Sequence, residues 1–259
     1  MKTAVYCGTR NVYYDMMTAA KSLLINSTVD LIYFLIEDDE FPYDLPDTIK
    51  CINVSNQSYF LPQSPNYTNP WTWMVLMRAA LSKVLPGIDR ILSLDIDTIV
   101  DSNIDELWDI PIDDYYYAAV QEPFRSSGSY YYGNFGVVYF NLKKMREDKK
   151  DDEVINKLNR YNYDANEQDA FNDSCQGKIY HLPPEYNGGN CFTKKHPQPK
   201  IYHFAGVKEF QSHEVVQKYQ AIFFNEIRKP VPTTNAARKR NARHNSSNVQ
   251  KSRRPKTNT

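Results

Sequence analysis

The sequence lacks any apolar run long enough to cross a bilayer. Its longest run, Leu31 to Ile36, has six residues, whereas a membrane-spanning helix needs about 20. The first residues, MKTAVYCGTRN, turn polar early and lack the apolar segment of a signal peptide. These absences argue against a membrane-spanning helix and predict a cytoplasmic location.

Paired cysteines are also missing. The four cysteines, Cys7, Cys51, Cys175 and Cys191, are widely spread, and none belongs to a Cys-x-x-Cys pair. This spacing argues against a structural zinc site. It is typical of free thiols in a reducing compartment.

Acidic residues are absent from the end of the chain. From Arg228 onward there are 10 Lys or Arg residues and no Asp or Glu, so residues 1–227 carry 21 basic and 31 acidic side chains. An acidic body argues against nucleic-acid binding by the folded domain. The composition predicts a folded domain over residues 1–229 and a disordered basic tail over 230–259. The tail predicts either weak contact with an anionic membrane surface, at its inner face, or an inert solvated extension.

Strand and helix signals alternate along the rest of the sequence. Short apolar runs predict strands at residues 3–7, 31–36, 51–54, 90–94, 116–120, 137–141, 179–182 and 200–203. Helical spacing and charge patterns predict helices at 14–24, 71–85, 143–160, 167–175 and 214–227. This alternation predicts a single α/β domain, Rossmann-like, with a mostly parallel sheet.

Two aspartates directly follow the predicted strand at 90–94. Asp95 and Asp97 are two positions apart in ILSLDIDTIV, so in extended chain both carboxylates point to one side. Ligands bind open α/β sheets at the carboxyl ends of strands, and carboxylates suit Mg²⁺ or Mn²⁺. A solvated turn is the simpler alternative. A third interpretation makes Asp95 the nucleophile of a haloacid-dehalogenase-type phosphatase.

Further motifs occur in order around this pair. They are DIDTIVDSNIDELWD, GNFGVVYFNLKKMRE, EQDAFND, HLPPEYN and HFAGVKEF. Together with the N-terminal strand, loop and helix, these pieces resemble glycosyltransferase family 8, which includes glycogenin and bacterial lipo-oligosaccharide galactosyltransferases. The resemblance spans roughly residues 3–210 of the 259.

The resemblance implies a fold of the GT-A type and a retaining glycosyltransferase. It implies transfer of a hexose, glucose or galactose, from a UDP-sugar to a saccharide or glycoconjugate acceptor. Asp95, Asp97 and His203 match the family's metal ligands. An imidazole beside two carboxylates favours Mn²⁺, with Mg²⁺ as the alternative.

The resemblance also assigns residues around the donor. Those expected to contact the nucleotide or diphosphate are Gly8, Thr9, Tyr13, Ile96, Gly206 and Lys208. Those expected at the reacting sugar are Arg78, Asn134 and Gln168, with Glu167 and Asp169 binding sugar hydroxyls. Lys208 departs from the family pattern, because it stands one residue closer to Gly206 than usual and Glu209-Phe210 follows it.

Retention can proceed without a nucleophilic side chain. The amide of Gln168 is a poor nucleophile, so we expect the acceptor to attack from the side of the leaving group. The competing interpretations are the phosphatase with Asp95 as nucleophile and a non-catalytic member of the fold that binds a sugar.

Overall fold

A seven-stranded sheet forms the centre of the computed structural model, which describes residues 1–188 and 198–227. Its strands are β1 (Thr3–Cys7), β2 (Leu31–Ile36), β3 (Ile49–Asn53), β4 (Arg90–Leu94), β6 (Tyr117–Gln121), β7 (Gly133–Asn141) and β8 (Ile179–Leu182). They lie in the order β3-β2-β1-β4-β7-β6-β8. Only β7 runs antiparallel to its neighbours within this sheet. The predicted α/β class with a mostly parallel sheet is confirmed.

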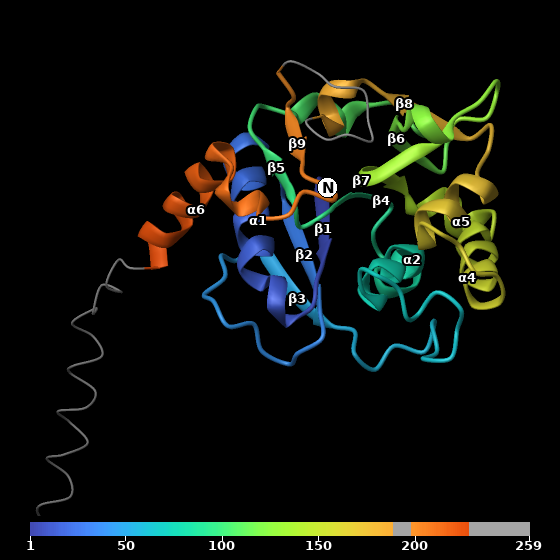
Figure 1. Cartoon of the computed structure of the whole chain (residues 1–259), viewed down its shortest axis with the longest axis horizontal. Coiled ribbons are helices and arrows are strands. Elements are labelled where there is room, and N and C mark those ends of the chain that lie inside the picture. The colour runs from blue at the N-terminus through green and yellow to red at the C-terminus, as the bar shows by residue number, and fades with distance from the viewer. Residues whose placement is uncertain (189–197, 228–259) are drawn as a thin grey trace, which may run out of the picture. The chain divides into compact units, whose positions relative to one another are not determined.

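Helices cover both faces of the sheet (Figure 1). On one face lies α1 (Tyr13–Asn26), and the opposite face carries α2 (Leu81–Val84), α3 (Leu142–Glu147), α4 (Lys150–Arg160) and α5 (Asn166–Ser174). In β1, Ala4 and Tyr6 are buried with α1, whereas Val5 is buried with the opposite helices. Burial on both faces explains why the strands are continuous apolar runs.

A second, two-stranded sheet lies beside α1. Its strands, β5 (Thr98–Val100) and β9 (Ile201–His203), run side by side in Figure 1. They pair antiparallel, with Thr98 opposite His203. Ile99 and Phe204 pack against Val216 and Tyr219 of α6 (Glu214–Ile227). This small sheet fixes one end of β9 next to the residues that follow β4.

The structure corrects several predicted boundaries. The predicted helix at 71–85 is a 3-10 helix, Trp73–Ala80, continued by the short α2. The predicted helix at 143–160 is divided because Lys149 has a left-handed backbone (φ 53°), after which α4 begins. Strand β5 was not predicted, since three residues directly after a turn carry no periodic pattern.

The predicted domain boundary stays a prediction, because residues 228–259 lie outside the described residues. Within the part of the chain that is described, no helix has the length and apolar character needed to cross a membrane.

Candidate metal and donor site

Three predicted metal ligands meet where β4 ends. Asp95 follows β4, and its backbone N–H donates to Gly136 O at 2.9 Å. His203 ends β9, and the next N–H, of Phe204, donates to Asp97 O at 3.0 Å. The Nε2 atom of His203 lies 3.5 Å from Asp95 Oδ2 and 3.5 Å from Asp97 Oδ1. One ligand atom from each residue falls within 4.8 Å of the other two, which fits a single divalent cation.

Burial and charge shape the protonation of these ligands. Burial lowers the pKa of His203, but the carboxylates of Asp97 and Asp95 outweigh burial and raise that pKa above its usual value. Burial raises the pKa of Asp97. For Asp95 the same effect of burial is overcome by the charge of Arg78, so its pKa is lowered. The charges of Asp95, Asp97, His203 and Arg78 therefore act on one another at this point of the structure.

Arg78 connects this cluster to the predicted sugar-binding residues. Its side chain is only 6% exposed, and its guanidinium contacts Asp95. It also lies 3.1 Å from Glu167 Oε1 and donates to Phe135 O at 2.9 Å. Burial raises the pKa of Glu167 to about 7, although Arg78 acts in the opposite direction. The structure thus brings Arg78, predicted from family position, into direct contact with Asp95, a candidate metal ligand.

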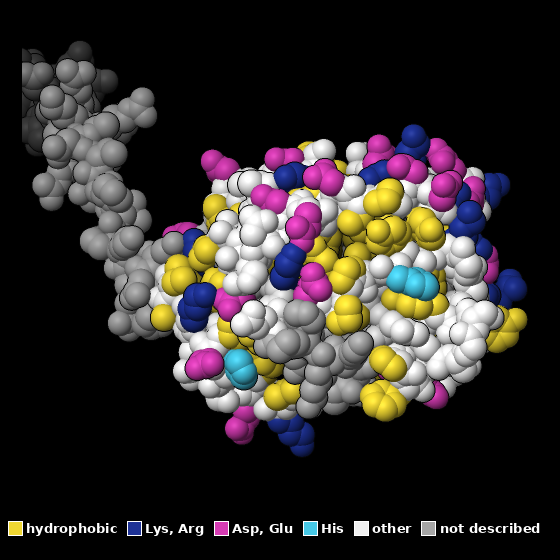
Figure 2. All heavy atoms as spheres, turned by 90° about the horizontal axis from the view of Figure 1, so that it is seen from above, with side chains coloured by type: hydrophobic (Ala, Val, Ile, Leu, Met, Phe, Trp, Pro, Cys, Tyr) yellow, Lys and Arg dark blue, Asp and Glu magenta, His cyan; other side chains and the backbone are white. Residues whose placement is uncertain are grey.

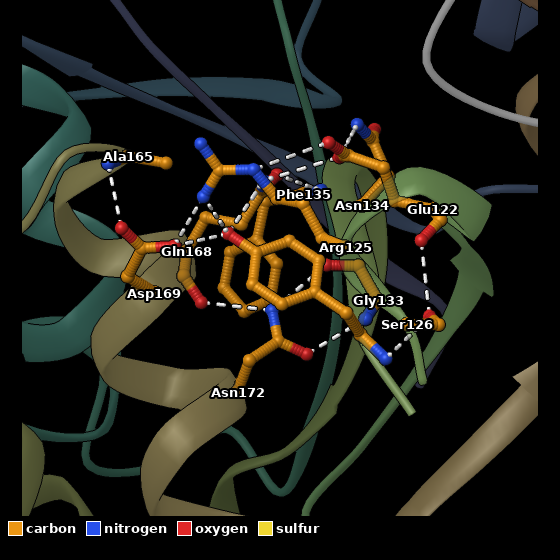
Figure 3. A network of polar contacts seen from close by, with 11 residues as sticks. Glu122, Arg125, Ser126, Gly133, Asn134, Phe135, Ala165, Gln168, Asp169 and Asn172 are labelled. Carbon is orange, nitrogen blue, oxygen red and sulfur yellow. Dashed lines mark hydrogen bonds and ion pairs between the residues drawn. The ribbon is translucent and has the colours of Figure 1, made fainter. Parts of the chain in front are cut away.

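The predicted amides form a hydrogen-bonded cluster (Figure 3). Gln168 Oε1 accepts from the Phe135 N–H at 2.8 Å, and Gln168 Nε2 donates to the Tyr132 hydroxyl at 3.0 Å. Asn134 Nδ2 donates to Glu122 Oε2 at 3.0 Å. Glu122 is buried. Both amides are therefore held in one orientation by the same cluster.

Asp169 lies at the edge of this cluster. Its Oδ1 accepts from Arg125 Nη1 at 2.6 Å and from the Tyr132 hydroxyl. Its Oδ2 accepts from the Ala165 N–H at 2.7 Å. Figure 3 shows Asp169 and Gln168 projecting from α5 toward the strand that carries Asn134. The two residues of this helix predicted to contact the sugar therefore share one polar surface.

Several residues of the site were missed by the sequence analysis. Gly136 lies beneath His203, Asn187 Oδ1 lies 2.9 Å from His203 Nδ1, and Glu122, Arg125 and Tyr132 hold the amide cluster. Gly136 and Asn187 belong to the motifs GNFGVVYF and HLPPEYN. The sequence analysis could therefore have found these two residues from their positions in the motifs. Glu122 and Arg125 lie in a loop without a recognised motif.

The N-terminal residues predicted to contact the nucleotide have different surroundings in the structure. An added Cβ on Gly8 would lie 3.8 Å from Ile96 Cγ2, so these two predicted donor contacts are neighbours. The Thr9 hydroxyl donates to Asn11. Tyr13 is 2% exposed, packs on Phe41 and donates to Asp38 Oδ2 at 3.0 Å. Its predicted stacking on a base stays a prediction, and this burial does not favour it.

Gly206 and Lys208 lie in the turn directly after β9. Gly206 has φ 71°, a conformation that favours glycine. Lys208 is exposed. Their predicted contacts with the diphosphate stay predictions.

Sequence comparison identifies the family. The sequence model described as Glycosyl transferase family 8 matches residues 4–208. This chain belongs to glycosyltransferase family 8. The family 8 chain is also similar to a Haemophilus influenzae protein described as a glycosyltransferase, with 32% identity over 123 residues. That match covers 42% of this chain and 37% of the relative, so the chain matches well under half of that protein's length.

Solved structures show the same GT-A fold. The family 8 chain is similar to the WbbM bifunctional glycosyltransferase, with a TM-score of 0.69 and 17% identity, over 88% of this chain and 50% of that one. It is similar to the galactosyltransferase LgtC in complex with donor and acceptor sugar analogues. There the TM-score is 0.64 and the identity 17%, over 91% of this chain and 99% of LgtC. At this identity the likeness concerns the fold. Membership of family 8 replaces the phosphatase interpretation of Asp95.

Proposed function

We propose that this family 8 chain is a retaining glycosyltransferase that transfers a hexose from a UDP-sugar to a saccharide or glycoconjugate. The observation that carries the proposal is the direct contact of Arg78 with both Asp95 and Glu167. This contact joins the candidate metal ligands to the α5 segment on which the resemblance places the sugar contacts. One continuous site of this kind suits a donor that has a diphosphate at one end and a sugar at the other.

The candidate ligands Asp95, Asp97 and His203 would hold Mn²⁺ or Mg²⁺. A divalent cation there would stabilise the negative charge that grows on the leaving diphosphate. Lys208, predicted from the family motif, would add a second positive charge at the same group. The amides of Gln168 and of the buried Asn134 are already oriented, so they can position sugar hydroxyls without rearranging.

Gln168 is held by hydrogen bonds at both ends of its amide, which favours positioning over attack. In the proposed reaction the acceptor oxygen bonds to the anomeric carbon on the face from which the diphosphate departs. The carbon–oxygen bond to the diphosphate breaks, and the acceptor proton passes to the departing phosphate oxygen. This course retains the anomeric configuration.

Donor turnover tests the proposal directly. UDP-glucose and UDP-galactose are incubated with the chain and Mn²⁺, and release of UDP is measured with and without excess chelator. We expect Mn²⁺-dependent turnover that Asp97→Asn abolishes, whereas Asp114→Asn, an exposed aspartate, has no effect. UDP binding without turnover would support the non-catalytic alternative. Turnover that persists in Asp97→Asn or in chelator would contradict the metal assignment.

A further inference from the structure

His203 must offer a bare ring nitrogen to a cation, and the structure shows what controls this. Neutral imidazole carries its proton on one nitrogen, and only the other nitrogen can bind a metal. Nε2 faces the two aspartates, each at 3.5 Å. Those carboxylates favour a proton on Nε2, which is the wrong tautomer for metal binding. Another group has to hold the proton on Nδ1.

Asn187 is placed to hold that proton. Its Oδ1 lies 2.9 Å from His203 Nδ1, within normal hydrogen-bond distance, whereas 3.5 Å to the carboxylates is long for N–H···O. Asn187 is fully buried at the end of the 3-10 helix Pro184–Asn187. An asparagine amide can be turned either way, so the question is which end faces His203.

Asn134 decides the orientation of Asn187. The Gly136 N–H can only donate, and it donates to Asn134 Oδ1 at 3.0 Å. On the opposite side, Asn134 Nδ2 donates to the carboxylate of Glu122 at 3.0 Å. A backbone donor and a carboxylate acceptor thus fix the two ends of the Asn134 amide independently.

The fixed orientation passes from one amide to the next. Because Asn134 presents oxygen, Asn187 must present Nδ2 to it, and this bond is 2.8 Å. Asn187 Oδ1 is then the atom that faces His203, and it requires a proton on Nδ1. The lone pair of Nε2 is left directed toward Asp95 and Asp97.

We propose that Asn187 is a positioning residue that selects the metal-binding tautomer of His203, and that Glu122 and Gly136 set its orientation through Asn134. The inference rests on the metal site of the proposed function but requires no sugar transfer. Hydrogen-bonded partners of metal-bound histidines are worth about 10–100-fold in metal affinity. The same Glu122 also accepts from Gln168 at 3.3 Å, so one carboxylate orients groups at both ends of the site.

Nitrogen NMR of the histidine rings tests the proposal on the metal-free chain at alkaline pH. The His203 signals are identified by selective broadening with trace Mn²⁺ and UDP. We expect the proton on Nδ1 in the wild type. A wild-type ring that carries its proton on Nε2 would overturn the proposal without any variant.

Two substitutions separate tautomer control from simple packing. Asn187→Leu should move the proton toward Nε2 and weaken Mn²⁺ binding about 10–100-fold, measured by calorimetry. Asn187→Asp keeps an acceptor and should keep the Nδ1 tautomer. Asn66→Leu removes an equally buried amide that bonds Leu158 O and Tyr161 O, and it should leave both readouts unchanged.

An unchanged tautomer and unchanged Mn²⁺ affinity in Asn187→Leu would refute the role of Asn187. If that variant does not fold, the wild-type and Asn187→Asp spectra still decide the matter. A chain that shows the expected tautomer and binds Mn²⁺ but turns over no donor would contradict the proposed function alone.

Discussion

The imidazole of His203 occupies the space where any side chain at Gly136 would begin. An ideal Cβ on Gly136 would lie 2.0 Å from His203 Cε1 and 2.2 Å from Nδ1. The backbones of both residues are held in strands, β7 and β9, so a side chain at position 136 would have to push the imidazole out of this position. The absence of a side chain at position 136 therefore leaves room for the imidazole in the candidate metal site.

Gly136→Ala should displace His203 and lower Mn²⁺ affinity by at least about tenfold. Loss of a group that orients a metal ligand has an effect of about this size. Calorimetry of Mn²⁺ binding in the presence of UDP measures the loss. Gly87→Ala is the matched control, because a Cβ there meets nothing within 4 Å. Equal affinities in the two variants would show that His203 does not bind the cation in the position seen here.

Arg78→Met should destabilise the metal-free chain by about 3–5 kcal/mol, because it leaves the partly buried carboxylate of Asp95 and the buried carboxylate of Glu167 without their counter-charge. Urea unfolding measures the change in free energy. Arg146→Met is the control, since Arg146 pairs with the exposed Asp89 and its loss should cost no more than about 1 kcal/mol. A similar loss of unfolding free energy in both variants would show that Arg78 does not stabilise the chain by neutralising Asp95 and Glu167.

Glu167 should make stability depend on pH. Its folded pKa of about 7 lies above the ordinary value of 4.5 for a glutamate, so the folded chain binds the proton more tightly than the unfolded one. The resulting stabilisation is complete below about pH 4.5 and is lost as pH rises through about 7. Glu167→Gln should remove this loss, which amounts to about 3 kcal/mol at most.

Urea unfolding of the metal-free wild type and of Glu167→Gln, at a series of pH values from about 4.5 to above 7, measures this difference. Glu147→Gln changes an exposed glutamate and should follow the wild-type curve. Parallel curves for the wild type and Glu167→Gln would show that Glu167 is ionised with an ordinary pKa.

Phe124 is a candidate contact for the acceptor. It is 84% exposed and lies between Glu122 and Arg125, which hold Gln168 and Asp169. Aromatic faces stack on sugar rings, so Phe124→Ala should raise the acceptor KM about 2- to 10-fold. Hydrolysis of the UDP-sugar without acceptor should be unchanged. Tyr161→Ala, another exposed aromatic change, should alter neither. An unchanged acceptor KM in Phe124→Ala would remove this residue from the acceptor site.

The composition of residues 231–259 predicts that they are dispensable for folding. They contain Val231 and Val249 but no larger aliphatic or aromatic side chain, too little to offset an ordering cost of about 1–2 kcal/mol per residue. A chain ending at Val231 should keep its Tm and its donor turnover. It should lose salt-sensitive binding to anionic vesicles if the basic segment contacts membranes. A lower Tm would contradict the dispensability.

On the face drawn in Figure 2, acidic and basic side chains are interspersed, without a broad basic area. Nucleic-acid binding requires concentrated positive charge. The expectation that the folded domain does not bind nucleic acid stays a prediction.

The sequence alone determined most strands of the sheet and two of the three candidate metal ligands. Strands buried on both faces must be apolar throughout, so β1, β2, β4 and β8 were predicted with the bounds that the structure shows. Asp95 and Asp97 also lie together as expected, but they occupy the turn between β4 and β5, in which the Thr98 N–H donates to Asp95 O, and not an extended strand. These are local consequences of chain geometry and composition.

Tertiary structure decided the rest. His203 is more than 100 residues from Asp97, and it joins the aspartates only because β5 pairs with β9. The three residues of β5 carry no periodic signal, so its pairing with β9 could not be predicted from the sequence. The same holds for Gly136, whose missing side chain matters only because an imidazole from a distant strand lies against it.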